Sequence, residues 1–350
     1  MRLFVFLFSI WLFQFNCNTP PEKINLTTPQ LPKEKMKGIS LVAPSRPFSN
    51  NPMLPLNELG ASWISVMPFA FSPLGQPKVF FNSSRQWWGE RPEGVIETIR
   101  LAHEQGIQVV LKPQVWMRGG WVGDMEFDNE EDWKQWQSEY SNFILTFAKI
   151  ADSMNVAVFC IGTEFKKAVQ KREDYWRGLI RAVKKIYAGQ LTYASNWDEY
   201  PLVPFWDELD FVGIDTYFPL VESKTPTVEE LKKAWQPIVK KLRKFYQKTG
   251  KPIVFTEYGY MSIDGCAYKN WELENKRTEI PVNEAAQANA IHALFDAFWQ
   301  EEWWGGGFLW KWYPNYSGEG QGRRKRFRAA DYTPQGKQAE GVLRDWFQKN

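Results

Sequence analysis

Two glutamates, Glu164 and Glu257, each follow a short apolar segment. The segment VFCIGTE ends on Glu164 and the segment IVFTE ends on Glu257, and both patterns predict a buried strand that ends on a charge. Such a charge is costly unless it is paired or used. Either residue alone could be a salt-bridged strand cap. Together, in one pocket, they are suited to act as acid and nucleophile on a glycosidic bond, which a retaining mechanism cleaves with carboxyl groups about 5–5.5 Å apart.

Polar and aromatic side chains stand near the ends of other predicted strands. Lys112 and Asn196 could hold sugar hydroxyls, and Tyr217 could donate a hydrogen bond that keeps a nucleophilic carboxylate ionised. Trp310 could form the platform beneath a sugar ring, whereas Asp215 could simply cap its own loop. The candidate substrate-binding residues are Lys112, Trp116, Asn196, Trp197, Tyr217 and Trp310.

The composition favours carboxylate chemistry on a sugar. There are 19 Trp among 350 residues and aromatic residues make up 16%, and apolar rings with one polar edge suit the stacking of hydroxylated ligands. The two histidines, His103 and His292, lie in predicted helices, which argues against a histidine triad or a histidine metal site. Three cysteines without a CxxC spacing argue against a disulfide framework and a cysteine zinc site. We expect no metal and no organic cofactor.

The charge balance does not indicate a polyanionic partner. Lys and Arg number 43, Asp and Glu number 40, and the formal net charge is +3. A short basic cluster near the C-terminus is interpreted as a solvated loop, because no nucleic-acid-binding motif surrounds it. The cluster comprises Arg323, Arg324, Lys325, Arg326 and Arg328. We therefore expect no nucleic-acid partner.

Eight apolar runs alternate with segments of helical period after residue 37. This alternation predicts a parallel sheet covered by helices, and eight such units favour an α/β fold, the (β/α)₈ TIM barrel, as a single catalytic domain over residues 37–350. An open doubly wound sheet is the alternative, but its usual glycine-rich phosphate turn is absent. The runs are Gly38–Ala43, Trp63–Met67, Gln108–Pro113, Ala157–Gly162, Leu191–Ala194, Phe211–Ile214, Pro252–Thr256 and Gly306–Trp310.

Helix signals accompany these runs. Pro92 opens a predicted helix that ends at Gly106, and Thr227 with Glu230 forms a capping box at the start of another. Between them, aromatic and aliphatic residues from Trp133 to Phe147 recur at three- and four-residue spacing. This stripe predicts that Trp133 and Trp136 belong to the core and not to a ligand site.

The N-terminal segment resembles an export signal. Arg2 is followed by an apolar run from Leu3 to Phe15, and Cys17 comes directly after it, where a lipoprotein signal would place its acylated cysteine. We expect a lipoprotein signal over residues 1–17, with Cys17 lipidated, and a proline-rich flexible tether over 18–36. The alternative is an uncleaved signal anchor. The expected location is outside the cytoplasm, as a membrane-anchored lipoprotein of a bacterial cell envelope.

Several motifs together resemble glycoside hydrolase family 113, a clan A family of (β/α)₈ barrels that includes β-1,4-mannanases. They follow family order from about residue 37 to 345. Thr163 precedes Glu164 as in this family, whereas Gln114 stands where many relatives carry histidine. The matching segments are LKPQVWM, GGWVGDMEF, CIGTEF, YWRGLIRAVKKIY, GQLTYASNW, FWDELDFVGIDTYFPL, KPIVFTEYGYMS and GGGFLWKW.

The resemblance implies that Glu164 is the acid/base and Glu257 the nucleophile of a retaining β-glycosidase. The expected substrate is a β-linked oligosaccharide or polysaccharide, and the expected activity is endo-β-1,4-mannanase on mannan or manno-oligosaccharides. Within the clan, β-mannosidase and β-glucanase activities are alternatives. A non-catalytic glycan-binding barrel is the alternative outside enzymes, since a fold alone does not fix function.

Overall fold

The computed structural model describes residues 34–316 and 322–349. Within these ranges, eight parallel strands close into a barrel in the order β1, β10, β9, β8, β7, β6, β4, β2. The closed ring confirms the predicted (β/α)₈ barrel and excludes the open doubly wound sheet. The barrel strands are β1 (Met36–Leu41), β2 (Trp63–Val66), β4 (Gln108–Leu111), β6 (Val158–Thr163), β7 (Gln190–Asn196), β8 (Val212–Asp215), β9 (Ile253–Tyr258) and β10 (Trp304–Trp312).

All eight predicted runs overlap a barrel strand, and the strand ends differ from the predicted ends by at most two residues. The largest differences are two residues at each end: β10 extends from Trp304 to Trp312, and β1 begins and ends two residues earlier than predicted. The pairing register shifts between Cys160 and Thr163 in β6 and between Ile214 and Asp215 in β8. These irregularities lie at the carboxyl ends of the strands, where side chains are re-aimed toward the barrel mouth.

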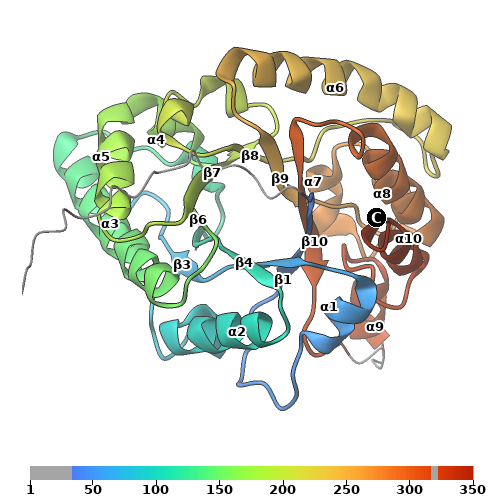
Figure 1. Ribbon diagram of the computed structural model, residues 1–350, viewed down its shortest axis with the longest axis horizontal. Coiled ribbons are helices and arrows are strands. Elements are labelled where there is room, and N and C mark those ends of the chain that lie inside the picture. The colour runs from blue at the N-terminus through green and yellow to red at the C-terminus, as the bar shows by residue number, and fades with distance from the viewer. Residues whose placement is uncertain (1–33, 317–321, 350) are drawn as a thin grey trace, which may run out of the picture. The chain divides into compact units, whose positions relative to one another are not determined.

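Helices surround the strands (Figure 1). Pro92 opens α2 and Gly106, with φ 71°, follows its end, as predicted. The capping box of Thr227 and Glu230 is present at the start of α6. The longer helices are α2 (Pro92–Glu104), α3 (Glu130–Ser153), α5 (Glu173–Lys184), α6 (Val228–Thr249), α8 (Glu284–Phe298) and α10 (Gln338–Phe347), and α1 (Leu54–Leu59) and α4 (Lys166–Lys171) are short.

The core has two parts. One lies between the strands and the helices and contains Trp133 and Trp136 of α3, both almost fully buried, which confirms that they are core residues. Trp136 stacks on Tyr140 with ring centroids 5.0 Å apart. The other part is a small separate cluster from the strands, as expected for a packed barrel interior: Met36, Trp63, Val110, Val158, Phe211, Val254 and Phe308.

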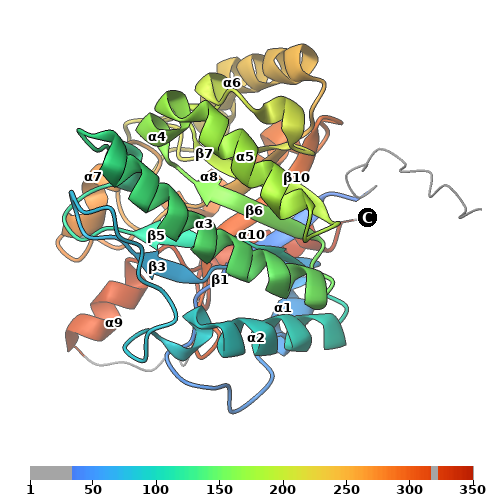
Figure 2. The ribbon, with the colours of Figure 1, turned by 90° about the vertical axis from the view of Figure 1, so that its left-hand side faces the viewer.

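Extra elements gather at one end of the barrel, on the left in Figure 2. β3 (Phe69–Phe71) and β5 (Gln114–Trp116) form a two-stranded parallel sheet just beyond the ends of β2 and β4. The short helix α7 (Asn270–Leu273) follows β9. This end therefore carries the loops that follow the strands, where barrel enzymes place their active sites.

The basic cluster is helical, which corrects the prediction of a loop. Residues 322–329 form α9 (Gly322–Ala329), and the side chains of Lys325 and Arg326 are exposed. The physical reason is that Lys and Arg are good helix formers when they can remain solvated.

The predicted signal segment 1–17, with Cys17, lies outside the described residues, as does the predicted tether up to residue 33. The first described strand begins at Met36. Among the described residues, no helix has both the length and the apolar character that a membrane crossing requires.

Candidate active site

Glu257 lies near the carboxyl end of β9 and is held through its backbone and its side chain. It is paired in register with Asp215 of β8. Its carbonyl oxygen accepts hydrogen bonds from the backbone N–H and the hydroxyl of Thr216, at 2.7 and 2.9 Å. Only 7% of the residue is exposed. The barrel wall therefore fixes the position of this carboxylate.

Three side chains from three different segments donate hydrogen bonds to the Glu257 carboxylate. Lys112 Nζ lies 2.6 Å from Oε1, and Gln114 Nε2 lies 3.0 Å from the same oxygen. The Tyr217 hydroxyl donates to Oε2 at 2.8 Å, so the hydrogen bond that the sequence predicted is present. Three donors, one of them a cation, stabilise the ionised form of a carboxylate that has lost most of its water.

Lys112 has a different place from the one predicted for a sugar-binding residue. Its side chain is fully buried, and its ammonium bridges Glu257 and Asp215, with 3.2 Å to Asp215 Oδ1. Burial alone would lower the pKa of Lys112, but the charges of Asp215 and Glu257 outweigh it and hold that pKa above its ordinary value. Lys112 therefore holds carboxylates, because a buried ammonium needs anionic partners more than it needs a hydroxyl.

Glu164 directly follows β6 and has a left-handed backbone conformation, with φ 55°. Few residues other than glycine adopt this region. Neighbouring groups fix the turn: Glu164 N–H donates to the carbonyl of Ala194 at 2.8 Å, and Phe165 N–H donates to the hydroxyl of Tyr193 at 2.6 Å. The strain at this residue, of order 1–3 kcal/mol, is thus held by β7.

From the described residues, the Glu164 carboxyl receives one hydrogen bond, from Trp121 Nε1 to Oε2 at 2.9 Å. Burial raises the pKa of Glu164 to about 8, and the charges of Asp215 and Glu257 add to the rise, whereas the Trp121 hydrogen bond opposes it. At neutral pH this carboxyl therefore carries a proton. A protonated carboxyl near an ionised carboxylate is the arrangement of a general acid and its partner.

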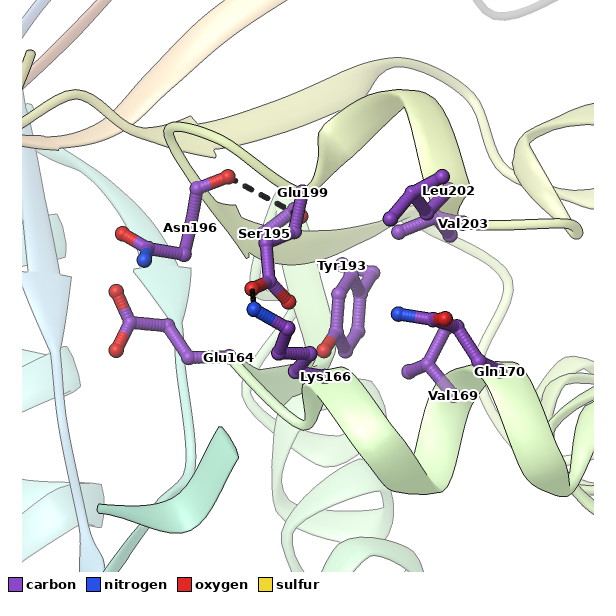
Figure 3. A pocket seen from close by; sticks show the side chains of 10 residues that line it. All are labelled: Glu164, Lys166, Val169, Gln170, Tyr193, Ser195, Asn196, Glu199, Leu202 and Val203. Carbon is purple, nitrogen blue, oxygen red and sulfur yellow. Dashed lines mark hydrogen bonds and ion pairs between the residues drawn. The ribbon is translucent and has the colours of Figure 1, made fainter. Parts of the chain in front are cut away.

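A small cavity lies beside Glu164 (Figure 3). Lys166 and Glu199 form an ion pair in it, and the Lys166 ammonium lies 6.0 Å from the centre of the Trp121 ring. The cavity volume of about 10 Å³ is too small for a sugar ring. In Figure 3 the side chains of Glu164 and Asn196 point to the same side. The cavity is therefore part of the support of Glu164 and not the sugar site.

Two predicted binding residues, Asn196 and Trp197, lie at and just after the end of β7. Asn196 Nδ2 donates to Asp198 Oδ1 at 3.0 Å, and Asn196 lines the same cavity as Glu164. Trp197 stacks on Trp271 of α7, with ring centroids 5.9 Å apart and an angle of 24° between the planes. The structure thus brings Asn196 to Glu164 and places Trp197 in an aromatic pair.

The other two predicted tryptophans differ in exposure. Trp116, in β5, is 54% exposed and packs beside Phe71 of β3 with ring centroids 5.5 Å apart. Trp310, in β10, is partly buried, and the Lys311 ammonium lies 5.4 Å from its ring centre. A Cβ atom added at Gly259 would lie 2.4 Å from the Trp310 carbonyl oxygen, so only glycine permits this close approach after β9.

Sequence reasoning did not assign a role at this site to Trp121 and left Asp215 as a possible loop cap. Trp121 lies in a loop, and the one sequence signal for it is that it belongs to the motif GGWVGDMEF. Asp215 is fully buried and accepts hydrogen bonds from Lys112 and Thr256. A stronger signal was available for Asp215, because an aspartate that ends a buried strand needs a buried cation. In the described ranges, no cluster of three or more His, Cys, Asp or Glu side chains could hold a metal ion.

A barrel with two strand-end glutamates in contrasting surroundings is an arrangement found in glycoside hydrolases. The model of Glycoside Hydrolase Family 113 matches residues 46–337. The chain therefore belongs to glycoside hydrolase family 113.

Solved structures of this family are similar over most of the chain. A β-1,4-mannanase complex has a TM-score of 0.76 and 26% identity, and covers 91% of this chain and 100% of its own. The β-mannanase of Alicyclobacillus acidocaldarius in complex with ManMIm has the same TM-score and identity, and covers 90% and 97%.

A β-glucuronidase from Ruminococcus gnavus matches with a TM-score of 0.59 and 16% identity, over 90% of this chain and 50% of its own, and this likeness shows the fold alone. No curated protein sequence matches the chain.

Proposed function

We propose that the protein is a retaining endo-β-1,4-mannanase that acts on mannan or manno-oligosaccharides. The observation that carries the proposal is the contrast between the two carboxyl groups: Glu257 is surrounded by donors, and Glu164 holds its proton at neutral pH. Membership of family 113 and the similarity to β-1,4-mannanase structures support the choice of mannan.

In the first step, the Glu257 carboxylate attacks the anomeric carbon and forms an ester bond to the sugar. The bond from that carbon to the leaving oxygen breaks, and Glu164 gives its proton to this oxygen. Tyr217 and Gln114 hold the two carboxylate oxygens of Glu257 in fixed directions before the attack. This orientation lowers the entropic cost of reaching the transition state.

In the second step, Glu164 acts as a base. Now ionised, it takes a proton from a water molecule whose oxygen bonds to the anomeric carbon, and the ester bond to Glu257 breaks. Glu164 recovers its proton and Glu257 its charge. Two displacements at one carbon restore the original β configuration, which is the stereochemical signature of the mechanism.

Sugar binding is proposed for the partly open polar and aromatic residues near the barrel mouth. Asn196 beside Glu164 can donate to a hydroxyl of the sugar, and Trp310 can stack beneath a ring. Trp116, exposed on β5, and the Trp197 pair with Trp271 offer further stacking surfaces. An extended set of such surfaces suits a polymer and supports endo action.

The test is a substrate panel of mannan, glucomannan, cellulose and short manno-oligosaccharides, with product lengths resolved and Glu257→Ala as the inactive control. We expect mannan to be cut internally, and proton NMR to detect the β-anomer as the first product. Release of single sugars only would indicate a β-mannosidase. Preference for cellulose would indicate a β-glucanase, and binding without cleavage would indicate a glycan-binding barrel. A first product of α configuration would contradict retention.

We also propose that the protein is exported and attached to the membrane of a bacterial cell envelope through lipid on Cys17. The apolar run before Cys17 and the proline-rich stretch after it support this location. Two or more acyl chains give stable attachment, whereas one gives only marginal binding. Wild-type protein should fractionate with membranes, and a chain that starts at Glu22 should be soluble and active. If Cys17→Ala stays in the membrane fraction as firmly as wild type, the uncleaved signal anchor is correct.

A further inference from the structure

A buried ion triad lies beneath the proposed nucleophile. The Lys112 ammonium contacts Glu257 Oε1 at 2.6 Å and the two carboxylate oxygens of Asp215 at 3.2 and 3.5 Å. Lys112 and Asp215 are both fully buried, and Thr256 donates a hydrogen bond to Asp215 Oδ1 at 2.7 Å. One buried cation is thus shared by two carboxylates, of which the retaining mechanism uses only Glu257.

The charge of Glu257 disappears during the reaction. Once Glu257 forms an ester with the sugar, it is neutral and can no longer balance the Lys112 ammonium. A buried ammonium that loses its counterion is strongly destabilising, because removing one partner of a buried pair leaves an uncompensated charge. The covalent intermediate therefore requires a second anion within contact distance of Lys112, and in this structure Asp215 meets that requirement.

We propose that Asp215 is a positioning residue: its carboxylate balances the positive charge of Lys112 while Glu257 is bonded to the sugar. This proposal rests on the retaining mechanism proposed above. In the free enzyme Lys112 holds Glu257 most closely, and in the intermediate it pairs with Asp215. The net charge of the buried site then stays constant, because the negative charge lost by Glu257 appears on Glu164 when Glu164 gives up its proton.

The electrostatics of Asp215 are consistent with this exchange. Burial raises the pKa of Asp215 to about 7, Lys112 opposes the rise, and the charge of Glu257 adds to it. When Glu257 becomes neutral, its contribution vanishes and the pKa of Asp215 falls, so Asp215 is more fully ionised in the intermediate. The charged and titratable groups that interact with Asp215 are Lys112, Glu257, Glu164, Cys160 and Tyr217.

The two half-reactions can be separated with a fluorinated substrate. An activated dinitrophenyl β-mannobioside with fluorine in place of its C2 hydroxyl forms the intermediate at a measurable rate and releases it slowly. Asp215→Asn should slow formation of the intermediate by about tenfold or more, because that step leaves Lys112 unpaired. Release should be unchanged or faster, because it restores the Glu257 charge. Equal slowing of both steps, or no slowing, would overturn the proposal.

Two further measurements separate charge from packing. In Asp215→Ala, formate should restore formation of the intermediate and formamide of similar shape should not; rescue by both would contradict a charge role. The matched control is Asp210→Asn, just before the other end of β8, where Asp210 accepts a hydrogen bond from the Leu191 N–H. Both steps should keep nearly wild-type rates in that variant.

A readout on the wild-type protein does not depend on the folding of any variant. In a crystal structure of the trapped intermediate, Lys112 Nζ should remain in contact with Asp215 and lie farther from Glu257. If Lys112 stays on the Glu257 ester and leaves Asp215, the proposal is wrong. If the reagent does not label Glu257 at all, the retaining mechanism has failed, which is a different result.

The pH dependence gives an independent check. The charge of Asp215 helps to raise the pKa of Glu164, so Asp215→Asn should move the basic limb of kcat/KM to lower pH. The groups that interact with Glu164 are Asp215, Glu257, Lys112, Trp121 and Tyr193. A variant that merely loosened the packing would lower the rate without shifting this limb in that direction, and an unshifted limb would contradict the proposal.

Discussion

The two strand-end glutamates have very different supports. Glu257 receives hydrogen bonds from Lys112, Gln114 and Tyr217 and is 7% exposed. Within the part of the chain that the structure describes, the Glu164 carboxyl receives one hydrogen bond, from Trp121, and its backbone is left-handed. Glu257 is therefore held in one orientation, as its proposed role of nucleophile requires, whereas Glu164 is left with few donors. Burial is the main reason that the pKa of Glu164 is raised, and its one hydrogen bond from Trp121 only partly opposes this effect.

This difference shows that the chemical behaviour of a glutamate depends on the groups around its carboxyl and not on the residue type alone. Both residues are glutamates at the mouth of the same barrel, and each influences the other, because the charge of Glu257 helps to keep Glu164 protonated. Substitutions at the two glutamates, at a donor to Glu257 and at Trp121, the donor to Glu164, test this contrast.

The largest effect is expected from removal of the carboxyl groups themselves. Glu257→Ala should lower turnover of every substrate by about three or more orders of magnitude, because the covalent step is lost. Glu164→Ala should be as severe on mannan but far milder on an aryl glycoside whose leaving group needs no proton. Kinetics on both substrates measure the contrast.

Azide provides the control for that contrast. It should rescue Glu164→Ala on the aryl substrate and yield a β-glycosyl azide, since the intermediate still forms on Glu257. Equal losses in Glu164→Ala on both substrate types would contradict the assignment of the two roles.

A tenfold to hundredfold effect is expected from one donor to Glu257. Tyr217→Phe removes the hydroxyl that donates to Oε2 at 2.8 Å, and a hydrogen bond to a charged group contributes about 1.5–3 kcal/mol, or roughly ten- to hundredfold in kcat. The matched control is Tyr246→Phe in α6, which should retain wild-type kcat. Unchanged turnover in Tyr217→Phe would show that Glu257 does not need this donor.

The single donor of Glu164 should affect pH dependence more than rate. The Trp121 hydrogen bond lowers the pKa of Glu164 against the other influences, so Trp121→Phe should raise that pKa further. The basic limb of kcat/KM should then move to higher pH, by roughly half a pH unit to one unit for a typical hydrogen bond. Trp87→Phe, at an exposed tryptophan, should leave the limb in place, and a shift to lower pH in Trp121→Phe would contradict the assignment.

The last effect is expected on stability and not on turnover. Because the pKa of Glu164 is raised from 4.5 to about 8 on folding, the stability it contributes is present below about pH 4.5 and is lost as pH rises toward 8. Glu164→Gln cannot ionise, so its melting temperature should exceed that of wild type by a margin that grows from pH 5 to pH 8. Glu58→Gln, at an exposed glutamate, should show no such growth. A margin that shrinks with pH would mean that Glu164 is ionised in the folded protein.

Much of the barrel and both glutamates could be predicted from the sequence. The eight apolar runs each overlap a barrel strand, because a parallel sheet buried on both faces requires continuous apolar residues. The capping box at Thr227 and the core tryptophans Trp133 and Trp136 are local or periodic features, which short spacing reveals. Residues whose environment is set by neighbours in the chain are therefore predictable.

Contacts made across the barrel could not be predicted in the same way. Lys112 was expected at a sugar hydroxyl, and its contact with Glu257 joins residues 145 positions apart. Trp121 reaches Glu164 from a loop that has no periodic pattern. The basic segment of α9 was expected to be a loop, because a run of like charges has no apolar face that marks a helix. These features depend on tertiary placement, which composition and spacing do not encode.

The support of Glu164 has an evolutionary consequence. Trp121 lies in a loop and Lys166 in the short helix α4, and both are partly exposed, whereas Lys112, a donor to Glu257, is fully buried. Loop segments accept substitutions more readily than buried ion pairs. Descendants of this protein could therefore adapt their working pH to a new habitat by changes around Trp121 alone, while the proposed nucleophile Glu257 and its charged partners stay unchanged.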